Sequence, residues 1–166
     1  MPEDGLVIRD ARPDELDRVA RLLRDAYSQY RAVLPGDAWS TYRENIMDVR
    51  SRAGTSQLIV AEYRGRLAGT VTLYLDGSEE GWPRGWAGIR LLGVRPAYRG
   101  KGVGRALMDE CVRRCRRSGV RTVGLHTSDM MAVAQRMYER MEFVRVPEFD
   151  HRPRPDVLVK AYRLDL

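Results

Sequence analysis

The chain has 166 residues and a mass of 19.0 kDa, the size of one ordinary domain with a single core, so we expect one domain over residues 1–166. Hydrophobic residues make up 43% and charged residues 31%, a balance that excludes an intrinsically disordered chain and a collagen-like repeat. The formal net charge is +6, and only two of the 29 basic residues are lysines.

The positive charge is concentrated in one segment. Residues 95–121 hold nine basic side chains against two acidic ones, and the rest of the chain nets minus one. Such a concentration indicates a local anionic ligand, whereas a uniformly basic surface would indicate general binding of nucleic acid or membrane, and we expect neither of these as a partner. An arginine-rich composition can also reflect the nucleotide content of a genome, so many of these arginines are equally well interpreted as surface residues.

Cysteine and histidine are too few for a disulfide framework or a zinc site. Cys111 and Cys115 are spaced as on one helix face, and His126 and His151 are the only histidines. The first five residues are acidic and lack the apolar core of a signal peptide, and no apolar run approaches membrane-spanning length. We expect a cytoplasmic protein without a metal, and leave its oligomeric state open, a homodimer being one option.

The first third of the chain predicts a strand and two helices. The strand is expected at residues 6–8. Pro13 followed by two acids suits a helix N-terminus, and apolar residues at steps of three and four predict an amphipathic helix that ends before Pro35. A weaker helical pattern runs from Trp39 to Val49 and is expected to stop near Gly54.

The middle of the chain predicts three strands. Residues 58–61 and 67–75 are rich in strand-forming residues and flank Arg64-Gly65, which predicts an antiparallel pair joined by a tight turn. Residues 76–85 form a turn-rich loop in which Trp82 is too apolar for a simple linker. A further strand is expected at 89–94.

The last third predicts helices and strands in alternation. A helix that starts within residues 102–104 is expected to end at Gly119, and is followed by a strand at 122–127 and a helix at 130–141. Strands are expected at 143–146 and 157–164, with a proline-rich loop at 147–155 between them. This order predicts a mixed α/β (α+β) domain with a mainly antiparallel sheet.

The segment from Val94 to Arg105 follows a strand, contains three glycines and opens a helix. The N–H groups of a first helical turn point outward, the helix dipole adds partial positive charge, and glycine lets an anion approach the backbone. The segment lacks both the Gly-Lys-Ser/Thr ending of a Walker loop and the Gly-x-Gly-x-x-Gly of a dinucleotide site. Arg99 to Gly104 instead fits Arg/Gln-x-x-Gly-x-Gly/Ala, the pattern of an acyl-coenzyme A cradle.

Residues 91–107, LLGVRPAYRGKGVGRAL, resemble the coenzyme A motif of the GNAT superfamily of N-acetyltransferases. The order of the other elements is also similar to that family over nearly the whole chain: Ile8-Arg9 before a Pro-Asp-Glu helix, the Arg64-Gly65 hairpin, and Ala134 followed by Tyr138 and Phe143. The resemblance implies a GNAT-like fold with a mixed, mainly antiparallel sheet of about six or seven strands flanked by about four helices.

The resemblance also implies acetyl-CoA as a cosubstrate. The strand backbone would hydrogen-bond the pantetheine arm, as an added strand does at a sheet edge, and the turn would hold the pyrophosphate. The alternative is that the glycines only make a tight turn and the basic side chains only face solvent. Arg95 is also within reach of the coenzyme phosphates, whereas the arginines at 113–117 lie ~14 to 20 Å along the helix from its N-terminus. The residues assigned to the coenzyme are Leu92, Gly93, Val94, Arg99, Gly100, Lys101, Gly102, Val103, Gly104 and Arg105.

The implied reaction is direct attack of an amine on the thioester, which needs a base for the amine and an acid for the leaving thiolate. Tyr138 matches the general acid that the superfamily usually keeps on this helix, and a packed core tyrosine is the alternative. The acid that the family commonly has on the strand before the cradle falls near Gly88, which cannot act as a base. His126, with an unperturbed pKa of ~6.5, is the base candidate, although it is also interpretable as simply packed. The other candidates are Glu79, Glu80 and Asp129.

Two further positions depart from the family pattern. Met131 stands where the family often has Asn, which puts a helix-to-coenzyme hydrogen bond in doubt. Glu142 stands where the family usually has Gly, which puts the turn after Tyr138 in doubt. Cys111 and Cys115 lie too far along the cradle helix for an acyl-cysteine intermediate and are interpreted as packed apolar residues.

The resemblance therefore implies an N-acetyltransferase that moves an acetyl group to a primary amine of a small molecule, a peptide or a protein. We expect the acceptor to lie among the loop after the first helix and the loops at 76–85 and 147–155. Two other classes of function stay open: a catalytically silent acyl-CoA binding or sensor module, and a nucleic-acid-binding protein, whose binding would fall steeply with salt. The side chains expected to line the acceptor pocket are Tyr27, Tyr30, Trp39 and Trp82, with Glu79, Glu80, Glu148 and Asp150 to attract an amine.

Overall fold

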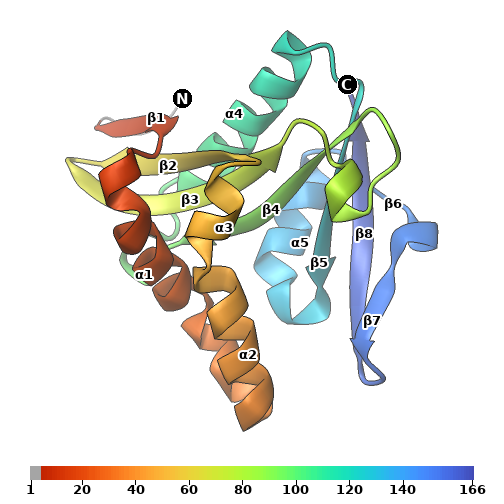
Figure 1. Ribbon diagram of the computed structural model, residues 1–166, viewed down its shortest axis with the longest axis horizontal. Coiled ribbons are helices and arrows are strands. Elements are labelled where there is room, and N and C mark those ends of the chain that lie inside the picture. Colours follow the sequence, from red (N-terminus) through yellow and green to blue (C-terminus); the bar gives the residue numbers. More distant parts are fainter. Residues whose placement is uncertain (1–4) are drawn as a thin grey trace. The chain divides into compact units, whose positions relative to one another are not determined.

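The computed structural model describes residues 5–166, and its strands and helices are labelled in Figure 1. Residues 1–4, which carry most of the acidic start from which we expect no signal peptide, lie outside the described residues. The chain forms two compact units. The first runs to Leu73 and includes Leu91–Glu110, and the second consists of Tyr74–Arg90 and Cys111–Leu166. This division does not test the expectation of one domain, which stays a prediction.

An antiparallel meander of three strands lies in the first unit. Strand β1 (Leu6–Asp10) pairs with β2 (Gln57–Tyr63), which pairs with β3 (Arg66–Tyr74). The predicted tight turn between β2 and β3 is confirmed. Arg64 and Gly65 both have positive φ, 49° and 82°, as two-residue hairpin turns require when they follow the twist of the strands.

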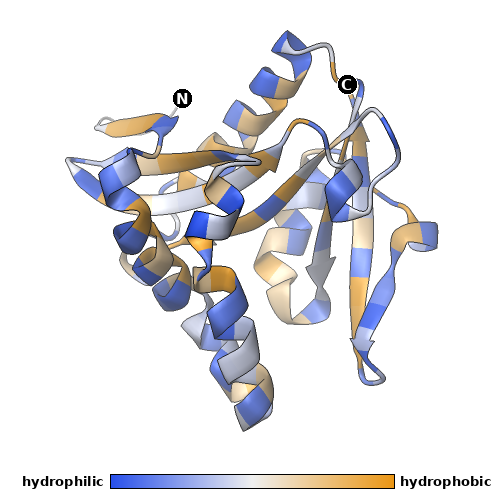
Figure 2. Cartoon of the chain, viewed as in Figure 1, coloured by the Kyte–Doolittle hydropathy of each residue, from blue (hydrophilic) through white to orange (hydrophobic). Residues whose placement is uncertain are grey.

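The helices of the first unit follow β1. They are η1 (Pro13–Glu15), α1 (Leu16–Tyr27), η2 (Ser28–Ala32), α2 (Gly36–Met47) and α3 (Val49–Ala53), where η marks a 3-10 helix. Hydrophilic and hydrophobic residues alternate along α1 in Figure 2, as expected for a helix with one buried face. The single second helix that the sequence predicts is in fact two, because Asp48 leaves the helical conformation with a ψ of 65°.

Strand β4 (Trp86–Val94) is divided between the units, and its residues from Leu91 belong to the first. After η4 (Pro96–Tyr98) the chain enters α4 (Val103–Arg117), which begins within the predicted glycine segment. Gly119 closes α4 as predicted. Its φ of 76° lets the Val120 N–H donate to the Cys115 carbonyl over 3.0 Å.

Four strands and one α-helix make up most of the second unit. Strand β5 (Thr122–Ser128) runs parallel to the start of β4 and antiparallel to β8 (Val157–Asp165), and β8 also pairs with β6 (Val144–Arg145) and β7 (His151–Arg154). The expectation of a plain loop at 147–155 was wrong, because a 3-10 helix, η6 (Pro147–Phe149), and strand β7 lie there. Because proline cannot donate to a strand ladder, Pro153 led us to predict a loop in place of β7. The register between β7 and β8 is irregular around Pro153. The helical elements are η3 (Ser78–Glu80), η5 (Asp129–Met131), α5 (Ala132–Arg140) and η6 (Pro147–Phe149).

The predicted fold class is confirmed. The strand order is β1-β2-β3-β4-β5-β8-β6, with β7 on β8, and β4–β5 is a parallel pair in an otherwise mainly antiparallel sheet. Residues 5–166 contain eight strands and five α-helices, more than expected because β7 and α3 are short elements with weak sequence signals. Over the same residues, no helix has the length and apolar character needed to cross a membrane.

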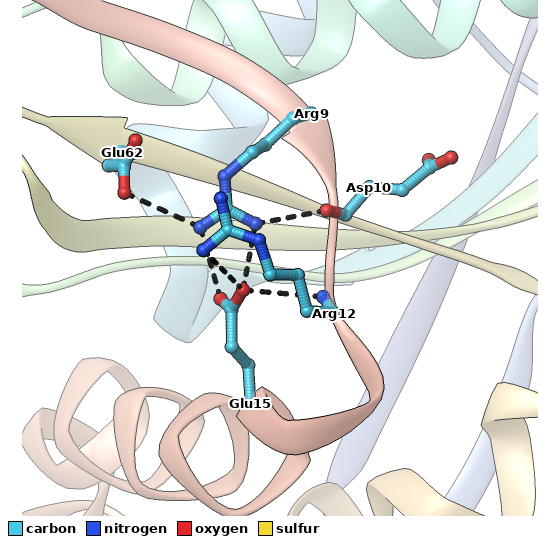
Figure 3. Close-up of polar contacts among 5 residues, drawn as sticks. All are labelled: Arg9, Asp10, Arg12, Glu15 and Glu62. Carbon is cyan, nitrogen blue, oxygen red and sulfur yellow. Dashed lines mark hydrogen bonds and ion pairs between the residues drawn. The ribbon is translucent and has the colours of Figure 1, made fainter.

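A buried ion pair connects β1 to the start of α1 in the first unit (Figure 3). Glu15 is 1% exposed and accepts hydrogen bonds from both terminal nitrogens of Arg9, over 2.9 and 3.2 Å. Figure 3 shows the Arg9 guanidinium between Glu15 and Glu62. The distance from Arg9 Nη2 to Glu62 Oε1 is 3.4 Å. Burial raises the pKa of Glu15, but the hydrogen bonds and charge of Arg9 outweigh it, so the pKa lies below its ordinary value. The sequence indicated only a helix-starting acid here.

Candidate active site

The segment assigned to coenzyme phosphates forms the turn that precedes α4 in the first unit. Gly100 and Gly102 have φ angles of 78° and 76°, a left-handed conformation that favours glycine. A Cβ atom built on either would meet nothing within 4 Å, so open space adjoins the turn. The Ala106 N–H donates to the Gly102 carbonyl over 3.0 Å, and the N–H groups of residues 103–105 precede the hydrogen-bond ladder of the helix. This geometry fits an anion held by backbone N–H groups.

Two of the basic residues near this turn hold helix α1. Arg99 donates to the Ala26 carbonyl at the end of α1 over 3.0 Å and to Gln29 Oε1 over 3.3 Å. Arg95 forms an ion pair with Asp25, also on α1, over 3.5 Å. A cation near the last carbonyls of a helix complements its dipole. These contacts give Arg95 and Arg99 a structural role that the sequence did not indicate.

The other two basic residues, Lys101 and Arg105, make contacts of other kinds. Lys101 Nζ lies 5.5 Å from the centre of the Tyr63 ring, a cation–π distance. Arg105 Nε lies 3.0 Å from the Asp109 carboxylate one turn along α4, and both side chains are about half exposed. An exposed pair at this spacing contributes little to stability, so the Arg105 guanidinium can exchange Asp109 for another anion.

The strand before the turn packs closely on α1. A Cβ atom on Gly93 would lie 3.2 Å from Ala26, 3.3 Å from Leu23 and 3.4 Å from Tyr27, so glycine is the residue that lets the helix approach. The Tyr27 hydroxyl donates to the carbonyl oxygen of Leu92 over 2.6 Å. One carbonyl assigned to the pantetheine arm therefore already accepts one hydrogen bond and has one further lone pair.

The aromatic residues expected around the acceptor divide between the units. Tyr27 lies 5.7 Å from Tyr30 and 6.0 Å from Tyr42, and Trp39 lies 6.4 Å from Tyr42, as ring centroids, so these four form one cluster in the first unit. Trp82 belongs to the second unit.

Trp82 lies against two paired glycines of the second unit. Gly88 on β4 and Gly124 on β5 are register partners. A Cβ atom on Gly124 would lie 2.8 Å from three carbons of the Trp82 indole, and one on Gly88 would lie 3.0 Å from the same ring. The indole is 5% exposed, and a side chain at position 88 would require it to shift.

Other rings gather around Trp82. Its centroid is 4.5 Å from that of His126 at an interplanar angle of 23°, and 5.7 Å from that of Trp86 at 18°, so both pairs are stacked. Phe149 lies 5.5 Å from Trp82, and His151 lies 5.1 Å from His126 in an edge contact. The loop at 76–85 is thus fixed by aromatic packing, as the apolar character of Trp82 indicated.

His126 is the base candidate that this cluster holds. Its Nε2 lies 3.0 Å from the Phe149 carbonyl oxygen. Burial lowers the pKa of His126, and this effect exceeds the opposing influence of the Phe149 carbonyl, so the neutral ring is favoured at neutral pH.

The other base candidates are less suited to proton removal. The Asp129 carboxylate forms an ion pair with Lys160, which occupies it. Glu80 lies 3.9 Å from Arg90, and Glu79 is exposed.

Tyr138 is held by the end of α5. It is 6% exposed, and its ring lies 5.9 Å from that of Phe143. The Phe143 N–H donates to the Tyr138 carbonyl and the Glu142 N–H to the Glu139 carbonyl, each over 3.0 Å, which is the Schellman pattern of helix termination. The doubt about this turn is resolved, because Glu142 adopts the glycine-like φ of 72° and the turn forms without glycine.

The two cysteines are buried on α4, and burial raises the pKa of Cys115 to about 11. A thiol with so high a pKa carries almost no thiolate at neutral pH and is a poor nucleophile. This agrees with the expectation of packed apolar residues.

The model of the acetyltransferase (GNAT) family matches residues 16–143. The chain belongs to this family. It is 32% identical over 146 residues to the mycothiol acetyltransferase of Propionibacterium freudenreichii subsp. shermanii. The aligned region covers 86% of this chain and 44% of that protein. The chain thus spans less than half the length of this relative.

Solved structures share the fold at low sequence identity. The yncA protein of Salmonella typhimurium, solved with its cofactor acetyl-CoA, superposes with a TM-score of 0.70 at 18% identity and covers 98% of this chain and 95% of its own. The paia N-acetyltransferase of Thermoplasma acidophilum, solved with coenzyme A, gives a TM-score of 0.75 at 14% identity and covers 96% and 99%.

The most distinctive departure of this GNAT chain has a physical reason. Position 88, near which the resemblance led us to look for a carboxylate, faces the Trp82 indole, and a Cβ atom there would lie 3.0 Å from the ring, so a side chain at this position would require the indole to shift. The titratable ring stacked on that indole is His126.

The packing of Trp82 generates a direct prediction. Gly124→Ala is expected to displace the indole and to lower the free energy of unfolding by about 1 to 3 kcal/mol, as for an overpacked core. Near-ultraviolet circular dichroism and chemical denaturation report the two effects. Gly36→Ala is the control, since a Cβ atom there meets nothing within 4 Å, and it is expected to leave both measurements unchanged. Equal behaviour of the two variants would contradict the described packing.

Proposed function

We propose that this chain transfers the acetyl group of acetyl-CoA to a primary amine, through a ternary complex in which the amine attacks the thioester directly. The observation that carries the proposal is the left-handed glycine turn at Gly100 and Gly102, which leads into the N-terminus of α4. Membership of the GNAT family supports the proposal, as do the acetyl-CoA and coenzyme A complexes of proteins with the same fold.

The residues of the turn fit a diphosphate. The N–H groups of residues 100–105 would donate to its oxygens, and the positive end of the α4 dipole would add to the attraction. Lys101 and Arg105 would contribute charge, whereas Arg99 would act mainly by holding α1 beside the strand. The backbone of Leu92, Gly93 and Val94 would hydrogen-bond the pantetheine arm.

Two side chains of the second unit would move the protons. His126 would take a proton from the ammonium form of the acceptor and later release it to solvent. The neutral amine nitrogen would bond to the thioester carbonyl carbon while the carbon–sulfur bond breaks, and the nitrogen would lose its second proton to solvent as the amide forms. Tyr138 would donate its hydroxyl proton to the leaving thiolate and regain one from solvent. Acetyl-CoA would supply the activated acetyl thioester.

The acceptor is proposed to be a small amine or the amine of a peptide or protein. Exposed carboxylates at Glu79 and Glu148 support an acceptor that arrives as a cation. A cytoplasmic location, the lack of nucleic-acid, membrane and metal partners, and a homodimer all stay predictions from the sequence.

One observation favours a second candidate function. Position 88 is a glycine packed against the Trp82 indole and carries no carboxylate, as expected of a protein that only binds or senses acyl-CoA and keeps the turn without that base. Release of coenzyme thiol separates this candidate from the transferase.

The glycine turn predicts the affinity for acetyl-CoA. Gly102→Ala is expected to weaken binding about tenfold or more, equivalent to about 1.4 kcal/mol, because an L-residue disfavours the left-handed backbone that aims the N–H groups. Gly119→Ala is the matched control, since Gly119 has the same φ of 76° and lies at the other end of α4. Isothermal titration calorimetry should give the Gly119→Ala variant the wild-type dissociation constant for acetyl-CoA. Equal losses in the two variants would reject the turn as the binding site.

Thiol release tests the reaction itself. Acetyl-CoA is incubated with panels of amines, amino acids and peptides, and at least one is expected to stimulate release of the free thiol. Tyr138→Phe is expected to lower that rate by about 10²- to 10⁴-fold while leaving acetyl-CoA affinity unchanged. No stimulation by any amine, with binding intact, would support the silent module, and a fully active Tyr138→Phe would remove the acid role.

A further inference from the structure

An ion pair of the second unit holds the backbone opposite His126. Ala161 on β8 is the register partner of His126 on β5. The Asp150 carboxylate accepts the Ala161 N–H over 2.7 Å, and Arg145 donates to the Ala161 carbonyl over 2.8 Å. Arg145 and Asp150 also bind each other through two hydrogen bonds of 2.6 Å, one to each carboxylate oxygen. This bidentate pair fixes Asp150 relative to the strand that faces His126.

The peptide unit that joins Phe149 to Asp150 is fixed from both sides. The Asp150 N–H donates to the Pro147 carbonyl over 3.0 Å, and the Asp150 side chain is held as described. In a planar trans peptide the carbonyl points away from the N–H of the same unit. The Phe149 carbonyl therefore has a set direction, and it meets His126 Nε2 over 3.0 Å.

A carbonyl oxygen can only accept a hydrogen bond, so His126 Nε2 carries a proton in this contact. The neutral ring is then the Nε2–H tautomer, whose lone pair lies on Nδ1. A backbone carbonyl that fixes one ring nitrogen of a histidine in this way defines the chemical role of the other.

We propose that Arg145 and Asp150 are positioning residues, which hold the Phe149 carbonyl so that His126 stays in its Nε2–H tautomer and offers Nδ1 to the acceptor amine. The part about the amine rests on the proposed function, whereas the tautomer does not. Neither residue is a catalytic residue, because both act through Phe149.

The charged neighbours are compatible with this role. The groups that act on His126 are His151, which disfavours its charged form, and Asp150 and Glu80, which favour it. Glu80 itself lies 3.9 Å from Arg90. Hydrogen bonds from Arg145 lower the pKa of Asp150 to about 2, so the ion pair stays charged over the whole pH range in which a histidine titrates.

Nuclear magnetic resonance of the ¹⁵N-labelled full chain, without acetyl-CoA, reads the tautomer directly. The chain has two histidines, and a His151→Gln variant assigns the signals of His126. The wild type is expected to show a protonated Nε2 with a slowly exchanging proton and an unprotonated Nδ1. Asp150→Asn is expected to give averaged shifts for the two nitrogens and faster exchange, and Arg145→Lys a smaller change in the same direction. Asp156→Asn, an exposed carboxylate of the β7–β8 turn, is expected to match the wild type.

A protonated Nδ1 in the wild type would overturn the proposal, and so would an Asp150→Asn variant with wild-type His126 signals. Arg145→Lys keeps the positive charge and gives the answer if Asp150→Asn does not fold. Kinetics then test the link to function: Asp150→Asn should lower kcat by about 10- to 100-fold and leave the KM for acetyl-CoA unchanged. The expected tautomer in a protein that transfers no acetyl group would reject the proposed function alone.

Discussion

The contact of Trp82 with Gly88 and Gly124 is the constraint on which the second unit depends. Two paired strands both have glycine at the same level where the indole lies against them. A Cβ atom on Gly124 would lie 2.8 Å from the ring and one on Gly88 3.0 Å from it. The contact fixes the loop at 76–85, and a carboxylate at position 88 would disturb it. The His126 ring stacks on the indole that this contact holds in place. This packing supports the proposal that His126 removes the proton of the amine.

The first unit depends on an equally close approach, that of α1 to the strand ahead of the glycine turn. Gly93 admits the helix, the Tyr27 hydroxyl binds the Leu92 carbonyl, and Arg99 binds the last turn of α1. The basic segment that first marked this region therefore has two tasks. Arg95 and Arg99 contact α1, and we propose Lys101, Arg105 and the backbone N–H groups as the principal partners for an anion.

The sequence predicted those features that depend on neighbours along the chain. The Arg64-Gly65 hairpin, the glycine turn before α4 and its end at Gly119 each follow from local backbone preferences. Features that depend on partners distant in the sequence were missed: the contact of Arg9 with Glu62, the Tyr27–Leu92 hydrogen bond, and the packing of Trp82 on Gly88 and Gly124. Strand β7 was missed because Pro153 disfavours a strand locally. The strand forms through its pairing with β8, which the local sequence does not indicate.

The dependence of kcat/KM on pH tests the central claim, that neutral His126 removes the proton from the amine. Only the neutral ring can accept a proton, so the rate should rise with pH through the His126 pKa, and that midpoint should lie below the ordinary value of about 6.5 because burial lowers it. In His126→Gln this acid limb should disappear and the rate should fall about 10²- to 10⁴-fold. A His126→Gln variant that keeps the same limb and the same rate would contradict the account.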